Sequence, residues 1–518
     1  MNIDRFLTNH DLALNPFAAE EARHDPVFER LINTAAGHPD FEKILGRIDQ
    51  PSTSVVFGEK GSGKTAMRLM IARRVADHND EADKRTLVVA YDDLNPVLDR
   101  LTQRRRQDLG FNKASKTDPE KLLSVVRLED HQDAIIAASV TTLVDALLDS
   151  EDADKQNGIN LTGSADEAMK KLPRQRRIDL AALTALYDQP RSGAVANRWA
   201  KLRPKLKLTW LPAWPLQRIG AIAISLVAAV LFLIALLSEE RRTLMQILGG
   251  ATGAAAVFMW GVCIWRHMSL WNLTRKIRRE TPAVERSAVD LRVMLGQIPR
   301  KDLVTQTWPL AGEHDTRFQL TNKLLSVLEL FGYHSIMVLV DRVDEPTLIQ
   351  GKADRMKPVV WPMLDNKFLQ QERVGLKLLM PIELRHLLHR ESPEFFQGAR
   401  LDKQNLIDRL TWSGATLYDL CSGRLRVCLK DTTADESKEP TLTDLFTPDV
   451  TRSMLVDALD QMHQPRDAFK FLYCVLQEHC NTVSDDDASY RIPRLTLETV
   501  RRQQSQRVQD LSKGLSPA

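Results

Sequence analysis

The sequence has few cysteines and little net charge. Its 518 residues include five cysteines, none of them in a C-x-x-C pair, and this odd number argues against a disulfide framework or a zinc site. The 71 basic and 68 acidic residues nearly balance, so there is no overall nucleic-acid-binding signature. The length predicts two to four domains. We therefore expect a multidomain protein with reduced, cytosolic thiols.

Motifs of exported proteins and of several enzyme classes are also missing. The first residues are polar and charged where a secretory signal would be apolar, so no cleaved targeting segment is expected. Neither the H-E-x-x-H pattern of zinc proteases nor the G-x-S-x-G pattern of serine hydrolases occurs. The guanine-reading pattern N-K-x-D is absent as well. Among nucleotides, this makes ATP the default expectation.

A glycine-rich stretch carries a complete phosphate-binding pattern. Residues 58–65 match G-x-x-x-x-G-K-[ST], between a strand predicted over 54–57 and a helix predicted over 66–75. The glycines allow the backbone N–H groups to turn toward an anion, Lys64 would contact the β- and γ-phosphates, and the Thr65 hydroxyl would bind Mg²⁺. The alternative is a glycine-rich turn with a chance lysine. The predicted nucleotide-binding residues are Gly58, Glu59, Lys60, Gly61, Ser62, Gly63, Lys64 and Thr65.

Two long apolar runs lie in the middle of the chain. Ile219–Leu237 contains 19 residues and Leu244–Trp265 contains 22, and neither run is charged. At ~1.5 Å per residue the first run reaches roughly 28 Å, close to the hydrocarbon thickness of a bilayer. The short connector permits only an antiparallel pair of helices. We predict a transmembrane hairpin, the alternative being a helix pair buried in a soluble core.

The flanking charges predict the orientation of this hairpin. Six basic residues between Arg198 and Arg218 precede the first run, and five between Arg266 and Arg279 follow the second, without an intervening acid. The positive-inside rule then predicts a two-pass inner-membrane protein with both termini and the nucleotide domain in the cytoplasm. The basic clusters would attract anionic lipid. The G-x-x-x-G pattern of Gly249–Gly253 permits close helix contact, with the first run or with another subunit.

An acidic motif follows a second buried strand, predicted over 335–340. Asp341 stands where the strand ends, as the Mg²⁺-supporting carboxylate of a phosphate-loop site does. Glu345 is the predicted catalytic base that polarises the attacking water, and Asp344 is the alternative. Arg385, after a strand predicted over 374–380, is a further candidate contact for the γ-phosphate. A solvated acidic turn is the alternative reading of the motif.

The separation of the two motifs along the sequence predicts the architecture. Lys64 and Asp341 must lie within one nucleotide's length, yet 276 residues intervene and both apolar runs fall among them. The predicted fold class is therefore α/β, with a parallel-sheet phosphate-loop NTPase core interrupted by the transmembrane hairpin, and with an all-helical lid region after it. The predicted parts are 1–50 (helical lead-in), 51–165 (first half of the core), 166–215 (basic helical linker), 216–268 (hairpin), 269–310 (returning helical linker), 311–400 (second half of the core) and 401–518 (helical lid).

This arrangement resembles the KAP group of phosphate-loop NTPases, within the wider STAND and AAA+-like class. The likeness covers about residues 50–470, and its specific parts are the two phosphate motifs. Asp341-x-x-Asp344-Glu345 is closer to the D-x-x-D-E of NACHT-type STAND proteins than to the D-D-x-D-R usual in KAP proteins. Residues 464–467, Gln-Pro-Arg-Asp, resemble the proline-arginine motif of the lid in this class. By that resemblance Arg466 would contact nucleotide phosphate, whereas the plainer alternative is a surface arginine at a helix start.

The resemblance implies a role in defence against phage or in membrane signalling. The leading interpretation is a membrane-anchored ATPase switch, with ATP and Mg²⁺ as cofactors, that forms a homo-oligomer and acts on an unidentified partner protein. A pore or transporter is the second interpretation, although two spans without ionisable residues could enclose a pathway only in an oligomer. The third is a scaffold that binds nucleotide without turnover.

Overall fold

The chain forms two compact units in the computed structural model. Unit 1 comprises Met1–Ala82, Ala90–Leu94 and Met337–Ala518, and unit 2 comprises Asp83–Val89 and Asn95–Ile336, so in sequence unit 2 interrupts unit 1. Both apolar runs belong to unit 2. The structure describes residues 1–19, 21–32, 37–109, 118–148, 158–161, 167, 169–170, 172–190, 194–207, 213–237, 242–310, 315–430, 440–484 and 489–512.

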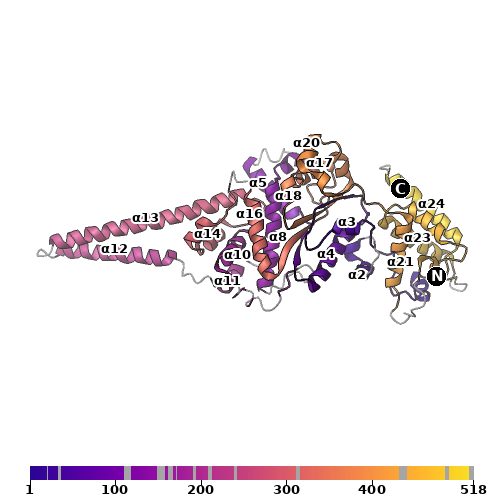
Figure 1. Ribbon diagram of the computed structural model, residues 1–518, viewed down its shortest axis with the longest axis horizontal. Coiled ribbons are helices and arrows are strands. Elements are labelled where there is room, and N and C mark those ends of the chain that lie inside the picture. The colour runs from indigo at the N-terminus through magenta and orange to yellow at the C-terminus, as the bar shows by residue number, and fades with distance from the viewer. Residues whose placement is uncertain are drawn as a thin grey trace. The chain divides into compact units, whose positions relative to one another are not determined.

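A five-stranded parallel sheet, whose strands are drawn as arrows in Figure 1, carries the fold. The strand order is β2-β3-β4-β1-β5. In the register of the central strand, Ser54 is paired with Lys377 of β4 on one side and with Asn405 of β5 on the other. The strands are β1 (Ser54–Gly58), β2 (Arg85–Tyr91), β3 (Tyr333–Val340), β4 (Val374–Pro381) and β5 (Asn405–Ile407). The division into units falls within β2 and within β3.

Most other described residues are helical. In unit 1 the helices are α1 (Ile3–Asn9), α2 (Pro26–Leu31), α3 (Phe41–Leu45), α4 (Lys64–Glu81), α17 (Ala353–Val360), α18 (Asn366–Leu369), α19 (Ile382–Leu388), α20 (Pro393–Ala399), α21 (Gly414–Val427), α22 (Arg452–Asp460), α23 (Pro465–Thr482) and α24 (Arg494–Ser512), with 3₁₀ turns at Ala22–His24, Trp361–Met363, Leu401–Lys403 and Leu442–Leu445. In unit 2 they are α5 (Asn95–Leu109), α7 (Pro119–Leu123), α8 (Leu128–Leu148), α10 (Arg174–Tyr187), α11 (Val195–Lys205), α12 (Ala213–Leu237), α13 (Arg242–Glu280), α14 (Ala288–Gly296), α15 (Arg300–Thr305) and α16 (Thr316–Leu328), with a 3₁₀ turn at Glu329–Phe331.

The strands predicted over 54–57, 335–340 and 374–380 are confirmed within two residues as β1, β3 and β4. Every residue of β1 and β4 is buried, which is typical of parallel strands covered on both faces. The expectation that the chain is purely helical after residue 401 is wrong, since β5 adds an edge strand beside β1. This strand is only three residues long, too short for its sequence to show a pattern.

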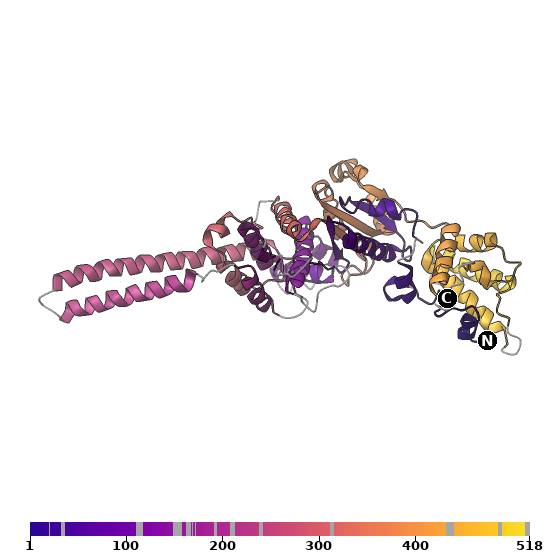
Figure 2. The ribbon, with the colours of Figure 1, turned by 60° about the horizontal axis from the view of Figure 1, so that its bottom comes forward.

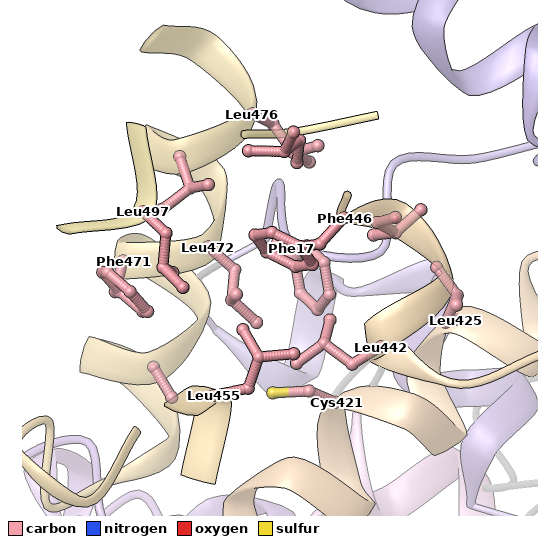
Figure 3. Packing of buried hydrophobic residues seen from close by; sticks show 14 of the residues in the cluster. Phe17, Cys421, Leu425, Leu442, Phe446, Leu455, Phe471, Leu472, Leu476 and Leu497 are labelled. Atoms are coloured by element: carbon pink, nitrogen blue, oxygen red, sulfur yellow. The ribbon is translucent and has the colours of Figure 1, made fainter. Parts of the chain in front are cut away.

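The C-terminal helices form a hydrophobic core with the first residues of the chain. Phe17 is 2% exposed and packs among buried side chains of these helices, including Cys421, Leu455 and Phe471 (Figure 3). The N-terminal ammonium group donates to the carbonyl oxygen of Cys480 at 3.0 Å. Phe17 is therefore a core residue, and the N-terminal segment is part of the helical region.

The two apolar runs form helices α12 and α13, which pack along each other (Figure 2). A Cβ on Gly249 would lie 3.6 Å from the backbone nitrogen of Phe232 on α12, so this glycine gives close contact within the chain. In the described residues, Gln246–Glu280 is long and apolar enough to cross a membrane, and only 17% of its most apolar window is buried. The apolar part of α12, Arg218–Ile234, is shorter. Residues 238–241 of the predicted connector lie outside the described residues.

The returning helical linker predicted over 269–310 is not one continuous helix. Helix α13 continues the second apolar run as far as Glu280, and α14 begins only at Ala288. Pro282 explains the break, because a proline disfavours helical backbone in the residue before it. The basic segment predicted as a helical linker over 166–215 contains α10 and α11.

Candidate functional site

The glycine-rich loop connects the end of central strand β1 to the start of helix α4. Gly61 and Gly63 have φ angles of 91° and 95°, which residues with a Cβ rarely adopt. Gly63 is the N-cap of α4, so the loop ends at the positive end of an 18-residue helix. The loop thus stands at the carboxyl edge of a parallel sheet, where ligands commonly bind.

The loop meets the acidic motif through a direct hydrogen bond. The Thr65 hydroxyl donates to Asp341 Oδ2 at 2.9 Å, joining residues 276 positions apart. Asp341 is 1% exposed, and its burial raises the pKa of the carboxyl group, against the opposing effects of Thr65 and the Arg68 charge. Arg68 Nε lies 3.4 Å from the same carboxylate oxygen. Both motifs predicted from the sequence therefore lie at one place.

Lys64 holds the loop in shape. Its Nζ donates to the carbonyl oxygens of Gly58 and Glu59 at 2.8 and 2.9 Å. Burial lowers the pKa of this ammonium group, while the negative charges of Asp344 and Asp341 oppose the shift. Arg466 lowers the pKa further through its positive charge. The ammonium group thus lies in the combined field of the acidic motif and of the C-terminal helices.

The two candidates for catalytic base have different surroundings. Glu345 forms an ion pair with Arg342, and its side chain is 47% exposed. Asp344 lines the same pocket as Lys64, and its negative charge is the strongest of those that oppose the lowering of the Lys64 pKa by burial. Arg342 has a left-handed backbone with φ of 59°, so the turn between Asp341 and Asp344 is strained.

Two residues of the C-terminal region contact the loop from outside the sheet. The Arg466 N–H lies 3.4 Å from the Gly61 carbonyl oxygen, and a Cβ on Gly61 would approach Arg466 Cβ to 2.8 Å. Trp412 Nε1 donates to the Ser62 carbonyl oxygen at 2.8 Å. Arg466 Nε is buried and has no hydrogen-bond partner in the described chain. The start of α23 therefore presents an unsatisfied cationic donor beside the glycine-rich loop.

A pocket of about 210 Å³ brings these groups together. The predicted site residues that line it are Lys60, Gly61, Gly63, Lys64, Thr65, Asp341, Asp344, Glu345 and Arg466. Its remaining lining includes apolar side chains such as Phe28 and Leu31 of α2 and Met70 of α4. One part of the pocket is thus charged and another is apolar, as a ligand with a phosphate chain and an aromatic base would require.

Four predicted residues lie outside this lining. Gly58, Glu59 and Ser62 belong to the loop but do not face the pocket, and Glu59 forms an ion pair with Arg409. Arg385 lies 3.7 Å from Asp408 and is not part of the lining either, so the structure does not support it as a phosphate contact.

Sequence reasoning missed three residues that shape the site. Arg68 follows Thr65 by three positions on α4, so its place on the same helix face could have been inferred. Trp412 and Arg424 line the pocket, but neither carries a local pattern that announces it. Their positions depend on how the C-terminal helices pack on the loop.

The residues present fit a magnesium ion bound together with phosphate. Thr65 and Asp341 provide a hydroxyl and a carboxylate, and Mg²⁺ prefers oxygen ligands while keeping several from water and phosphate. Within the described ranges, no group of three or more His, Cys, Asp or Glu side chains could hold a metal ion unaided. Two protein ligands would leave the other positions around the ion to water and phosphate oxygens.

Comparison of the chain with family models, with curated proteins and with solved structures gives no match.

Proposed function

We propose that this protein is a membrane-anchored, Mg²⁺-dependent ATPase that acts as a signalling or anti-phage defence switch. The observation that supports it most is the Thr65–Asp341 hydrogen bond inside a pocket that contains Lys64 and Arg466. A phosphate-loop NTPase core needs this juxtaposition of a glycine-rich loop and a strand-end carboxylate. The KAP-like arrangement of the sequence motifs favours the same function, and the defence or signalling role rests on that resemblance.

In this proposal each residue has a definite task. The N–H groups of residues 58–65 surround the phosphates, and Lys64 transfers its hydrogen bonds from loop carbonyls to phosphate oxygens. Thr65 and Asp341 hold Mg²⁺, which neutralises charge that develops on the phosphates. Glu345 accepts the proton of the attacking water, with Asp344 as the alternative. Arg466 contacts the phosphate chain from the C-terminal helices.

We propose further that α12 and α13 cross the membrane as a hairpin with the nucleotide site on the cytoplasmic side. Their apolar side chains are exposed in the isolated chain, for example Leu226 at 61% and Phe258 at 75%. Exposure of many large apolar side chains is costly in water and favourable in lipid. Homo-oligomerisation in the ATP-bound state belongs to this proposal as well, and ATP can favour that state only by binding it more tightly than the other state.

Nucleotide binding and turnover in detergent-solubilised protein test this function. Lys64→Ala is expected to reduce ATP affinity about 100-fold, whereas Lys43→Ala, an exposed lysine outside the pocket, leaves it unchanged. Glu345→Gln should retain ATP binding and lose turnover about 100-fold or more. Equal ATPase rates in wild type and Glu345→Gln would remove Glu345 from its role, and unchanged binding in Lys64→Ala would overturn the proposal.

One observation favours a second candidate, a membrane scaffold that binds ATP without hydrolysing it. Arg342 holds Glu345 in an ion pair, so that the carboxylate is occupied by an arginine and not free to contact an attacking water. Arg342→Ala distinguishes the two functions, because it frees Glu345. An ATPase rate that appears only in this variant would support the scaffold, whereas a clear rate in wild type that the variant does not exceed would support the switch.

A further inference from the structure

The side chain of Arg424 is buried in the lining of the pocket and keeps one donor unpaired. Arg424, on α21, is 1% exposed and lines the same pocket as Lys64. Its Nε donates to the Pro16 carbonyl oxygen at 2.7 Å, and its Nη1 lies 2.6 Å from Asp25 Oδ2. Its Nη2 is buried and finds no hydrogen-bond partner among the residues that the structure describes. Such a donor is costly unless an acceptor reaches it.

The surroundings of Arg424 are apolar and its charge is compensated. The ring of Phe469 lies 4.3 Å from the guanidinium carbon, and Leu420 and Phe28 also line the pocket. Asp25, itself 2% exposed, neutralises the guanidinium group and is held by the Val27 N–H at 3.0 Å. A neutral pair has little attraction for phosphate. A heterocyclic base suits this place better, because it has apolar faces and an edge with hydrogen-bond acceptors.

We propose that Arg424 Nη2 donates a hydrogen bond to the purine base of the nucleotide whose phosphates lie at Lys64. This inference rests on the proposed function and adds a base-binding residue to it. Asp25 is a positioning residue, because it fixes the guanidinium group without touching the base. Since Arg424 belongs to α21 and Asp25 precedes α2, a bound base would hold these two elements together at the pocket.

Comparing ATP with inorganic tripolyphosphate tests the proposal, because only ATP has a base. The dissociation constants of both ligands are measured by calorimetry on the full chain in detergent, for wild type and Arg424→Lys. Lysine keeps the charge opposite Asp25 but lacks the second branch of the guanidinium group. ATP is expected to bind about tenfold more weakly to the variant, as for the loss of one hydrogen bond from a charged donor, while tripolyphosphate binds as before.

Two further variants complete the experiment. Asp25→Asn/Arg424→Gln removes both charges, so that neither is left buried alone, and the same selective loss of ATP affinity is expected. Arg426→Gln, an exposed position on the same helix and outside the pocket lining, should change neither dissociation constant.

The possible outcomes separate this proposal from the function on which it rests. ATP affinity that stays unchanged in both Arg424 variants, or that falls equally for ATP and tripolyphosphate, overturns the role of Arg424. Wild-type protein that binds neither ligand overturns the nucleotide site itself.

Discussion

The Asp133 cluster of unit 2 (Asp133, Tyr187 and Arg317) and the pocket of unit 1 both contain buried charged side chains. They differ in whether the buried groups find hydrogen-bond partners within the protein. Asp133 is fully buried and accepts hydrogen bonds from Tyr187 at 2.8 Å and from Arg317 at 3.2 and 3.3 Å. In the pocket, Arg424 and Arg466 keep buried donors without partners. A cluster that satisfies itself has a structural role, whereas unsatisfied donors lining a pocket indicate a ligand.

The largest effect on stability is expected from a substitution in the Asp133 cluster of unit 2. Arg317→Ala removes the counter-charge of Asp133 and should lower the free energy of unfolding of this unit by about 3–5 kcal/mol. Hydrogen exchange of the α8 amides measures the loss. The double variant Asp133→Ala/Arg317→Ala should recover much of it, because no unpaired charge remains. A loss below about 1 kcal/mol in the single variant would show that the cluster is not structural.

The next largest effect is the change in the stability of unit 2 with pH. Burial raises the pKa of Asp133 to about 6, although Arg317 and Tyr187 oppose the shift. The folded state therefore holds this proton more tightly than the unfolded state, so the stability that the group contributes is fully present below about pH 4. It is lost as pH rises toward 6, by up to about 3 kcal/mol.

Asp133→Asn provides the measurement for that pH dependence. In this variant the hydrogen-exchange protection of the α8 amides should no longer fall between about pH 4 and 6, whatever the absolute stability of the variant. Identical slopes in wild type and variant would contradict the assigned pKa.

A smaller effect, on ATP affinity, is expected where Trp412 contacts the glycine-rich loop in unit 1. Trp412→Leu removes the hydrogen bond to the Ser62 carbonyl oxygen, and ATP affinity should fall about fivefold, as for one neutral hydrogen bond. Trp361→Leu is the matched control, since Trp361 donates to Glu391 at 3.0 Å and lies outside the pocket. Equal effects of the two substitutions would mean that Trp412 acts on general stability and not on the loop.

The sequence predicts the parts of the site that depend on local pattern. The glycine-rich loop, the strand before it and the helix after it form a continuous motif, and Asp341 directly follows a buried strand, so these elements could be recognised without coordinates. The same holds for the two apolar runs that become α12 and α13. Periodicity and spacing are sufficient in all these cases.

The remaining parts depend on tertiary packing and could not be predicted. Strand β5 has three residues and becomes a strand by pairing with β1. Arg424 belongs to an amphipathic helix, where an arginine normally indicates an exposed face, yet it is buried against Asp25. The ion pair between Arg342 and Glu345 likewise depends on the left-handed backbone at Arg342, which no sequence pattern announces.

The central claim is that the glycine-rich loop and the acidic motif form one nucleotide site, and a double-mutant cycle tests it most directly. The Mg²⁺-dependent affinity for ATP is measured in wild type, Thr65→Ala, Asp341→Asn and the double variant. If both residues support the same ion and phosphate chain, the two losses are coupled by about 1 kcal/mol or more. Losses that add within about 0.5 kcal/mol would contradict a shared site.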